Sequence, residues 1–186
     1  MTPDPKAIFF DMDGTLLDWQ TGMNETWLGA CEAGFARVEG GSASALYDAV
    51  LVKRDWFWSD HARATKGRMD LLAASTRIVH EAMISLGHDL PGVAAEIALD
   101  YRTQREQAIA PYPGAIDLLD ALKRRGTPMA LITNGAAASQ RRSIERCALT
   151  QYFDCILIEG EFGCGKPDER VFRHALTSCG VDPHEA

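Results

Sequence analysis

The sequence predicts an α/β fold: a core of parallel β-strands linked by helices, interrupted after its first strand by an all-helical insertion. Three short apolar runs end abruptly in polar or glycine-containing residues, which is typical of strands buried on both faces of a parallel sheet. The runs are Ala7–Phe10, Met129–Ile132 and Cys155–Ile158. From about Asp18 to Gln107 the chain has no such run and shows only helical spacing, so we expect this stretch to be the insertion.

Two segments of the predicted core carry the signals of a helix. From Ala115 to Leu122 the apolar residues share one helical face, and Gly126 stands where a C-terminal cap is expected. The segment Asp168–Cys179 has a similar apolar stripe, with Pro167 at its start and Gly180 beyond its end. Strands and helices therefore alternate along the core, as they do in α/β proteins.

The expected domain organisation follows from these segments. Residues 1–17 and 108–186 form the core, and residues 18–107 form a helical domain between them. The aromatic run Trp56–Trp58 lies among several arginine and lysine residues of the helical domain. Such a cluster either packs the domain's own helices, which is the commoner role of aromatic residues, or lines a substrate pocket.

Composition limits the classes of partner. The 186 residues are 46% hydrophobic, which is enough for a domain-sized core, and their formal charge is -7. An acidic protein is repelled by nucleic acids and by anionic membranes, so neither is expected as a partner, whereas small phosphorylated metabolites fit if positive charge is local. The segment Met1–Phe10 resembles neither a signal peptide nor a membrane anchor, and we expect a cytoplasmic protein.

The strand predicted to end at Phe10 is followed by the loop Asp11–Thr15, which holds two carboxylates two residues apart. Burying such anions is costly unless a cation or hydrogen-bond donors compensate. Mg²⁺ is the simplest compensation, because it prefers one or two carboxylates together with phosphate and water oxygens. In a loop, Asp11 and Asp13 can both face one reacting phosphorus, and Gly14 lets a ligand approach. Taken alone, these residues also suit an ordinary turn.

Three motifs in this order resemble those of the haloacid dehalogenase-like (HAD) hydrolases. The family's first motif, a hydrophobic strand followed by Asp-x-Asp-Gly-Thr, is matched by Ile8–Thr15. The second, a strand ending in Thr or Ser, is matched by Leu131–Gly135, and the third, a lysine before a helix, by Gly165–Asp168. The resemblance implies a Rossmann-like core, and the helical insertion is similar to the cap domain of the phosphoglycolate phosphatase-like branch.

The resemblance also implies a role for each matched residue in the Mg²⁺-dependent hydrolysis of a small phosphomonoester. Asp11 attacks phosphorus and forms an aspartyl phosphate, while Asp13 acts first as general acid and then as general base. Both aspartates are the expected Mg²⁺ ligands. The Thr133 hydroxyl and the Asn134 backbone N–H bind the phosphoryl oxygens, and Lys166 stabilises the charge on phosphate and on Asp11.

Asp13 separates branches of the family: its dehalogenases lack this second aspartate, so Asp13 favours phosphate ester chemistry. Two other functions remain open. One is a phosphomutase of the same family, which returns the phosphoryl group to its substrate instead of to water. The other is a non-catalytic phospho-accepting module that uses Asp11 as a switch, although such a module needs no helical insertion. Outside the family context, Thr133 suits a helix N-cap and Lys166 a solvated surface.

The family's fourth motif, an acidic pair on the strand after the third-motif helix, has no match. The sequence stops at Ala186, and Asp182 comes too early to substitute. In the family the missing strand lies beside the one that ends at Asp11, so Ile8–Phe10 would form an open apolar edge, which invites pairing with another chain. We therefore expect a core that is incomplete at its C-terminus: either a fragment of a longer product, or a chain whose open edge a second chain covers. We also expect weak Mg²⁺ binding and less activity than an intact relative has.

Overall fold

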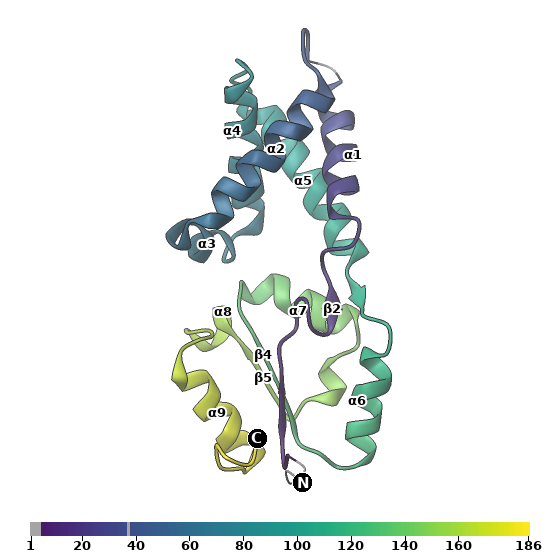
Figure 1. Cartoon of the computed structure of the whole chain (residues 1–186), viewed down its shortest axis with the longest axis vertical. Helices are drawn as coiled ribbons and strands as arrows, with labels where there is room; N and C mark the ends of the chain where they lie inside the picture. The colour runs from purple at the N-terminus through teal and green to yellow at the C-terminus, as the bar shows by residue number, and fades with distance from the viewer. Residues whose placement is uncertain (1–4, 37) are drawn as a thin grey trace. The chain divides into compact units, whose positions relative to one another are not determined.

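The computed structural model describes residues 5–36 and 38–186, so that residues 1–4 of the predicted core segment 1–17 lie outside the described residues. The chain forms two compact units, which we call the sheet unit and the helical unit (Figure 1). The sheet unit consists of Met1–Trp19 and Ile109–Ala186, and the helical unit is Gln20–Ala108.

Three parallel strands form the main sheet of the sheet unit as far as the structure describes it. They are β1 (Ile8–Phe10), β4 (Met129–Thr133) and β5 (Cys155–Ile158), in the order β1-β4-β5. The register places Phe10 opposite Leu131 and Thr133 opposite Ile158, so the carboxyl ends of all three strands lie at one edge. The predicted α/β class and parallel sheet are therefore confirmed.

Helices cover both faces of this sheet (Figure 1). Alternate residues of β4 enter different apolar clusters: Leu131 packs with residues of α6 (Ala115–Arg124) and α7 (Ala137–Arg146), whereas Ile132 packs with residues of α9 (Glu169–Cys179). All five residues of β4 are buried, because a central strand with helices on both faces has no solvent-facing side. The sheet unit is thus a three-layer α/β/α arrangement.

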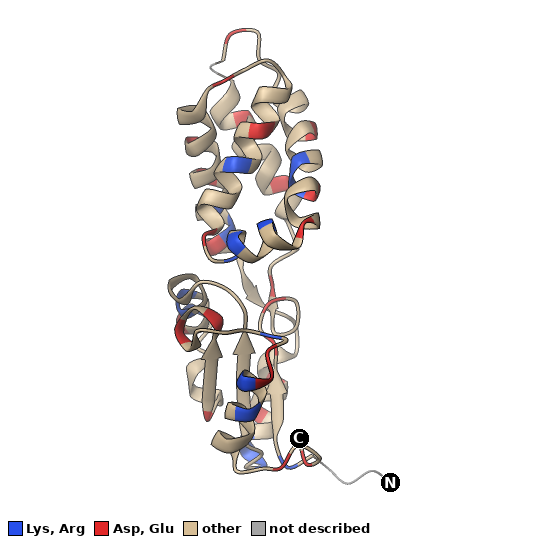
Figure 2. Ribbon diagram, turned by 90° about the vertical axis from the view of Figure 1, so that its left-hand side faces the viewer, with Lys and Arg blue, Asp and Glu red and all other residues tan. Residues whose placement is uncertain are grey.

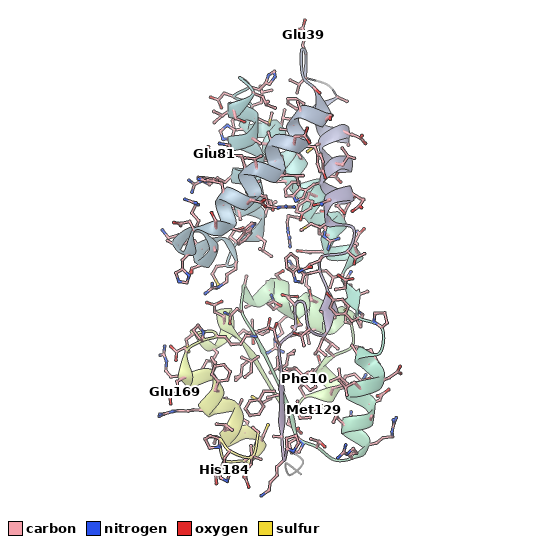
Figure 3. The ribbon with its side chains drawn as sticks, viewed as in Figure 1. Phe10, Glu39, Glu81, Met129, Glu169 and His184 are labelled. Carbon is pink, nitrogen blue, oxygen red and sulfur yellow. The ribbon has the colours of Figure 1, made fainter. Side chains whose placement is uncertain are left out.

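The charged residues of the sheet unit lie outside its three parallel strands (Figure 2). Figure 3 shows Phe10 and Met129 among the packed side chains of the interior, while Glu169 and His184 lie at the periphery. This distribution matches the sequence pattern, in which apolar runs end abruptly at polar residues.

The helix α7 and four short elements of the sheet unit have no counterpart among the elements predicted from the sequence. The short elements are β2 (Leu17–Asp18), β3 (Ala110–Pro111), the 3₁₀ turn η1 (Thr150–Tyr152) and the one-turn helix α8 (Glu159–Phe162). β2 and β3 pair antiparallel beside the points where the chain leaves and re-enters the sheet unit. Elements of two to four residues are too short to show a hydrophobic period, which explains why the sequence gives no signal for them.

The described part of the helical unit, residues 20–36 and 38–108, contains five helices. They are α1 (Met23–Phe35), α2 (Ala43–Ser59), α3 (His61–Gly67), α4 (Leu71–Ser85) and α5 (Pro91–Ala108). Ser42, Asp60 and Asp70 cap α2, α3 and α4, each accepting a hydrogen bond from a backbone N–H of the first turn. The unit has its own apolar core, in which Trp27 stacks on Tyr101 with ring centroids 3.4 Å apart. Within the described ranges, no helix combines the length and apolar character needed to cross a membrane.

Two residues of the aromatic run Trp56–Trp58 pack the helical unit itself, whereas Trp58 is 38% exposed. Phe57 is 4% exposed and belongs to the apolar core, against which Trp56 is partly buried. The guanidinium of Arg63 lies 4.2 Å from the centroid of the Trp56 ring and donates a hydrogen bond of 2.6 Å to the Trp56 carbonyl oxygen. These contacts join α2 to α3 and support the packing role that aromatic clusters commonly have.

The helices α1 and α5 approach closely at Gly34. A Cβ atom at this position would lie 2.2 Å from Cγ1 of Ile97, which is 1% exposed and cannot move freely. Gly34→Ala is therefore expected to destabilise the helical unit by about 1–3 kcal/mol, the usual cost of overpacking. Gly29→Ala in the same helix has nothing within 4 Å of the new Cβ, and should be neutral or stabilising by up to about 1 kcal/mol. Urea unfolding followed by circular dichroism measures both, and equal stability of the two variants would contradict the close approach.

Candidate active site

The two aspartates of the first motif follow β1 in a tight turn built around Met12. The Met12 side chain is fully buried, and its carbonyl oxygen accepts a hydrogen bond of 2.9 Å from the Leu17 N–H. Gly14 adopts a φ of 82°, which favours glycine, and donates its N–H to the Leu17 carbonyl at 2.9 Å. The buried Met12 anchors the turn, while Asp11 and Asp13 on either side of it remain partly exposed.

Lys166, in the loop before α9, reaches the end of β1. Its ammonium group donates hydrogen bonds to Oδ1 of Asp11 and to the carbonyl oxygen of Ile132, the latter at 2.7 Å. The side chains of Lys166 and Asp11 are 26% and 43% exposed, so this ion pair is only partly shielded from water. The third-motif lysine thus contacts the first-motif aspartate directly, although 155 positions separate them.

The end of β4 is joined to Asp13 through a residue of α7. Thr133 is 2% exposed, and its hydroxyl donates to Oε1 of Gln140 at 3.4 Å. The Nε2 of Gln140 donates to Oδ2 of Asp13 and to the carbonyl oxygen of Asn134, both at 3.1 Å. One side-chain amide therefore links the first and second motifs.

Gln140 was not identified from the sequence. It is 7% exposed, and Gln140 and Ile144 are the buried residues of α7. Their four-residue spacing puts a polar side chain on the buried stripe of a helix, where it needs hydrogen-bond partners. That spacing is the signal that could have revealed it.

Asn134 holds the backbone of the third motif in place. Its Nδ2 donates to the Lys166 carbonyl oxygen, and its Oδ1 accepts from the Lys166 N–H, both at 2.7 Å. A Cβ atom at Gly165 would lie 2.4 Å from Oδ1 of Asn134, so a larger residue there would collide with this pair. The Asn134 side chain therefore positions Lys166, and the phosphoryl contact predicted for the Asn134 backbone N–H stays a prediction.

The turn after β4 is fastened to the end of β5. Glu159 accepts a hydrogen bond of 3.0 Å from the Gly135 N–H through its carboxylate, and the Gly160 N–H donates to the Gly135 carbonyl oxygen at 3.0 Å. A Cβ atom at Gly160 would lie 2.6 Å from the backbone nitrogen of Ala137. The backbones approach so closely here that only glycine fits without rearrangement.

The helix that follows Lys166 begins at a charged cap. Asp168 accepts hydrogen bonds from the Arg170 side chain, at 2.7 and 3.0 Å, and from the Arg170 backbone N–H, at 2.9 Å. The Arg170 side chain, followed by this backbone bond, lowers the pKa of Asp168 to about 2. Asp168 therefore stays ionised at neutral pH and satisfies the start of α9.

The donors available to a metal ion at this edge are carboxylate oxygens. Asp11 and Asp13 are of the kind that Mg²⁺ prefers, and Mg²⁺ is commonly bound by only one or two carboxylates. Among the residues described, no group of three or more His, Cys, Asp and Glu side chains could hold a metal ion. The two aspartates thus fit a magnesium site that takes its remaining ligands from substrate and water.

One continuous set of hydrogen bonds joins all five predicted site residues, with Gln140 and Asn134 as its branching points. The members are Asp11, Asp13, Thr133, Asn134 and Lys166. The set brings a carboxylate paired with an ammonium group, a second carboxylate and a hydroxyl to the carboxyl edge of a parallel sheet. This edge is where open α/β sheets bind ligands.

Known proteins resemble the chain in sequence and in fold. Phosphoserine phosphatase of Thermus thermophilus is 40% identical over 110 residues, which cover 59% of this chain and 43% of that protein. Glyceraldehyde 3-phosphate phosphatase of Methanopyrus kandleri is 27% identical over 187 residues, covering 97% of this chain and 73% of that protein. The structure of the HAD-hydrolase YfnB from Bacillus subtilis, bound to magnesium, matches with a TM-score of 0.65 at 18% identity, covering 94% of this chain and 72% of that one.

The chain thus spans less than half the length of the Thermus phosphatase that it matches. The family model described as "Hydrolase: haloacid dehalogenase-like hydrolase" matches residues 5–186. This match covers nearly the whole sequence, includes all three motifs and confirms the resemblance. The chain belongs to the haloacid dehalogenase-like hydrolase family.

Proposed function

We propose that this chain carries the active site of a phosphatase that hydrolyses a small phosphomonoester through an aspartyl phosphate on Asp11. The observation that carries the proposal is the contact between Lys166 and Asp11 at the carboxyl edge of the sheet. A fixed cation beside a carboxylate lets that carboxylate approach an anionic phosphoryl group without prohibitive repulsion. Curated relatives named as phosphatases support the same chemistry.

The proposed reaction has two steps. In the first, a carboxylate oxygen of Asp11 attacks phosphorus, the ester P–O bond breaks, and Asp13 gives its proton to the departing oxygen. In the second, Asp13 takes a proton from a water molecule, which attacks phosphorus and releases inorganic phosphate and the Asp11 carboxylate. Mg²⁺ held by Asp11 and Asp13 would offset negative charge on the phosphoryl group. The magnesium in the YfnB structure supports that choice of ion.

Thr133 and the Asn134 N–H are the proposed phosphoryl ligands from β4. The Thr133 hydroxyl makes a long bond of 3.4 Å to Gln140, which is weak by the usual criteria. A hydroxyl hydrogen can rotate to another acceptor at little cost. Thr133 is therefore suited to turn its hydrogen towards a phosphoryl oxygen when substrate binds.

The substrate is proposed to be a small phosphorylated metabolite. Relatives are named for phosphoserine, glyceraldehyde 3-phosphate and phosphoglycolate, and their common feature is a phosphate ester on a small molecule. Neither a nucleic acid nor a membrane is part of the proposal, and the net charge of -7 argues against both. A cytoplasmic location stays a prediction.

A screen of phosphorylated metabolites tests this function, with release of inorganic phosphate as the measurement. We expect release that requires Mg²⁺ and falls at least about 10³-fold in Asp11→Asn, which removes the nucleophile. Asp117→Asn is the matched control, because Asp117 is an exposed aspartate in the first turn of α6 and should leave activity unchanged. The screen should include a chain extended to the length of the relatives.

Two results would favour the other readings. A requirement for a bisphosphate activator, with the phosphoryl group returned to the substrate, indicates a phosphomutase. A stable acyl phosphate that forms from a small phosphodonor and is not hydrolysed indicates a phospho-accepting module. Activity that survives Asp11→Asn would contradict the proposed nucleophile.

The two hydrogen bonds between the Asn134 side chain and the Lys166 backbone, which we call the Asn134 clamp, predict an effect on stability in addition to any effect on activity. Asn134→Ala removes two hydrogen bonds to the backbone of Lys166 in a partly buried position, so we expect a loss of about 1–3 kcal/mol. Gln151→Ala removes a hydrogen bond to the Ala148 carbonyl oxygen from an exposed amide, and should cost at most about 0.5 kcal/mol. Urea unfolding of the two variants measures the difference. Equal losses would show that Asn134 does not hold the third motif.

We also propose that a second chain covers the open edge of the sheet. β4 is the only neighbour of β1 among the described strands, and an apolar groove of about 680 Å³ runs beside β1. The groove is lined by Pro5, Ala7, Ile8, Phe9, Phe172, Leu176, Pro183 and Ala186. An open edge beside an apolar groove favours pairing with another chain.

Light scattering after size exclusion measures this association. We expect a mass of at least twice 20.4 kDa for the unsubstituted chain and 20.4 kDa for Phe172→Glu, which puts a charge into the groove. Leu118→Glu is the control, because Leu118 is 48% exposed on α6 outside the groove and should not change the mass. A monomer at every concentration would rule out a second copy of this chain at the open edge.

A further inference from the structure

The side chain of Gln140 uses both ends of its amide within the site. Oε1 accepts from the Thr133 hydroxyl at 3.4 Å, and Nε2 donates to Oδ2 of Asp13 and to the Asn134 carbonyl oxygen, both at 3.1 Å. Gln140 is 7% exposed, so these bonds are largely shielded from water. The three partners come from the ends of β1 and β4.

The identity of the partners fixes the direction of the amide. Asp13 and Asn134 both present acceptor oxygens to Nε2, whereas Thr133 presents a hydroxyl that can donate. A flipped amide would place its oxygen against two acceptors, which is unfavourable in a buried position. Gln140 therefore presents an N–H donor to the Asp13 carboxyl group.

We infer that Gln140 is a positioning residue for the proton transfer carried out by Asp13. This inference rests on the proposed phosphatase function and deepens it. A hydrogen bond from a buried donor limits rotation of the Asp13 carboxyl group and holds it in one orientation. The carboxyl group can then transfer its proton to the leaving oxygen without first rotating into a suitable orientation.

The helix that carries Gln140 is itself held firmly. Ile144, one turn later on α7, is fully buried in the apolar cluster beneath β4. Arg141 makes two hydrogen bonds to Glu161 of α8, at 2.6 and 2.7 Å, which join the outer side of α7 to the end of β5. A donor on a rigid element positions its partner better than a donor on a mobile loop.

Gln140 could stabilise only the fold or could position Asp13, and the two roles predict different dependences of the reaction rate on the leaving group. An alkyl phosphate expels a strongly basic alkoxide and needs a proton from Asp13, whereas an aryl phosphate such as 4-nitrophenyl phosphate expels a weakly basic phenolate. A structural defect should slow the first step, the release of the leaving group, by the same factor for both esters. A positioning defect should slow this first step chiefly for the alkyl ester, whereas the second step, in which Asp13 activates water, is common to both esters.

The test compares the two esters in Gln140→Leu and Gln140→Met. Both variants remove the N–H donor to Asp13 without adding a charge, and the unbranched methionine side chain is close to glutamine in length. For each variant we expect the single-turnover rate of leaving-group release to fall by about 10²-fold on the alkyl ester and by less than about threefold on the aryl ester, with little change in KM. Ile144→Val weakens the same helix without touching Asp13, and should lower both activities equally.

A second measurement examines the contact without catalysis. In protein labelled with ¹⁵N-glutamine, the side-chain amide resonance of Gln140 is assigned by its loss in Gln140→Leu. Asp13→Ala should shift this resonance, because it removes one of the two acceptors of Nε2. A resonance that does not move overturns the inference.

The outcomes separate the inference from the function on which it rests. If the unsubstituted chain and its extended form release phosphate from neither ester, the proposed function fails and the inference falls with it. If they are active but the Gln140 variants slow leaving-group release from both esters equally, or from neither, the phosphatase assignment stands and the positioning role is refuted. A selective loss on the alkyl ester, with the shifted amide resonance, establishes the role.

Discussion

The ion pair between Lys166 and Asp11 is the interaction on which the arrangement of the site depends. Lys166 lies far along the chain from β1, and its ammonium group is placed by the Asp11 carboxylate and the Ile132 carbonyl oxygen. A partly exposed ion pair alone contributes little, often less than about 1 kcal/mol. The two hydrogen bonds from the Asn134 side chain fix the orientation of the Lys166 backbone. They require a small residue at Gly165, because a side chain there would collide with Asn134.

The part of the fold with local signals could be predicted from the sequence. Buried parallel strands are almost entirely apolar whichever strands lie beside them, so the sequence predicts the bounds of β4 and β5 to within one residue. The same holds for α9, where the sequence predicts a start at Asp168 and the structure uses that residue as the N-cap. The paired strands β2 and β3 could not be predicted from the sequence, because two-residue strands depend on contacts between distant segments.

The candidate site shows the same division. The motif residues Asp11, Thr133 and Lys166 could be found because their types and order are distinctive. Gln140 and the carboxylate of Glu159 could not, because their parts in the site follow from which helix and which turn face each other across the sheet. A sequence lists possible hydrogen-bond donors, whereas the packing of the helices decides which acceptors they meet.

The pairing of Lys166 with Asp11 also bears on how a substrate would reach the site. The ammonium group is offset by that carboxylate, Asp13 adds a further acidic group, and the whole chain carries a net charge of -7. Before a cation binds, one ammonium group faces two acidic side chains in an acidic chain, and this balance does not favour electrostatic steering of a phosphate dianion. A divalent cation at the two aspartates would reverse that balance. Capture of substrate would then depend on prior loading of the site with metal, and its rate would follow cation occupancy more closely than ionic strength.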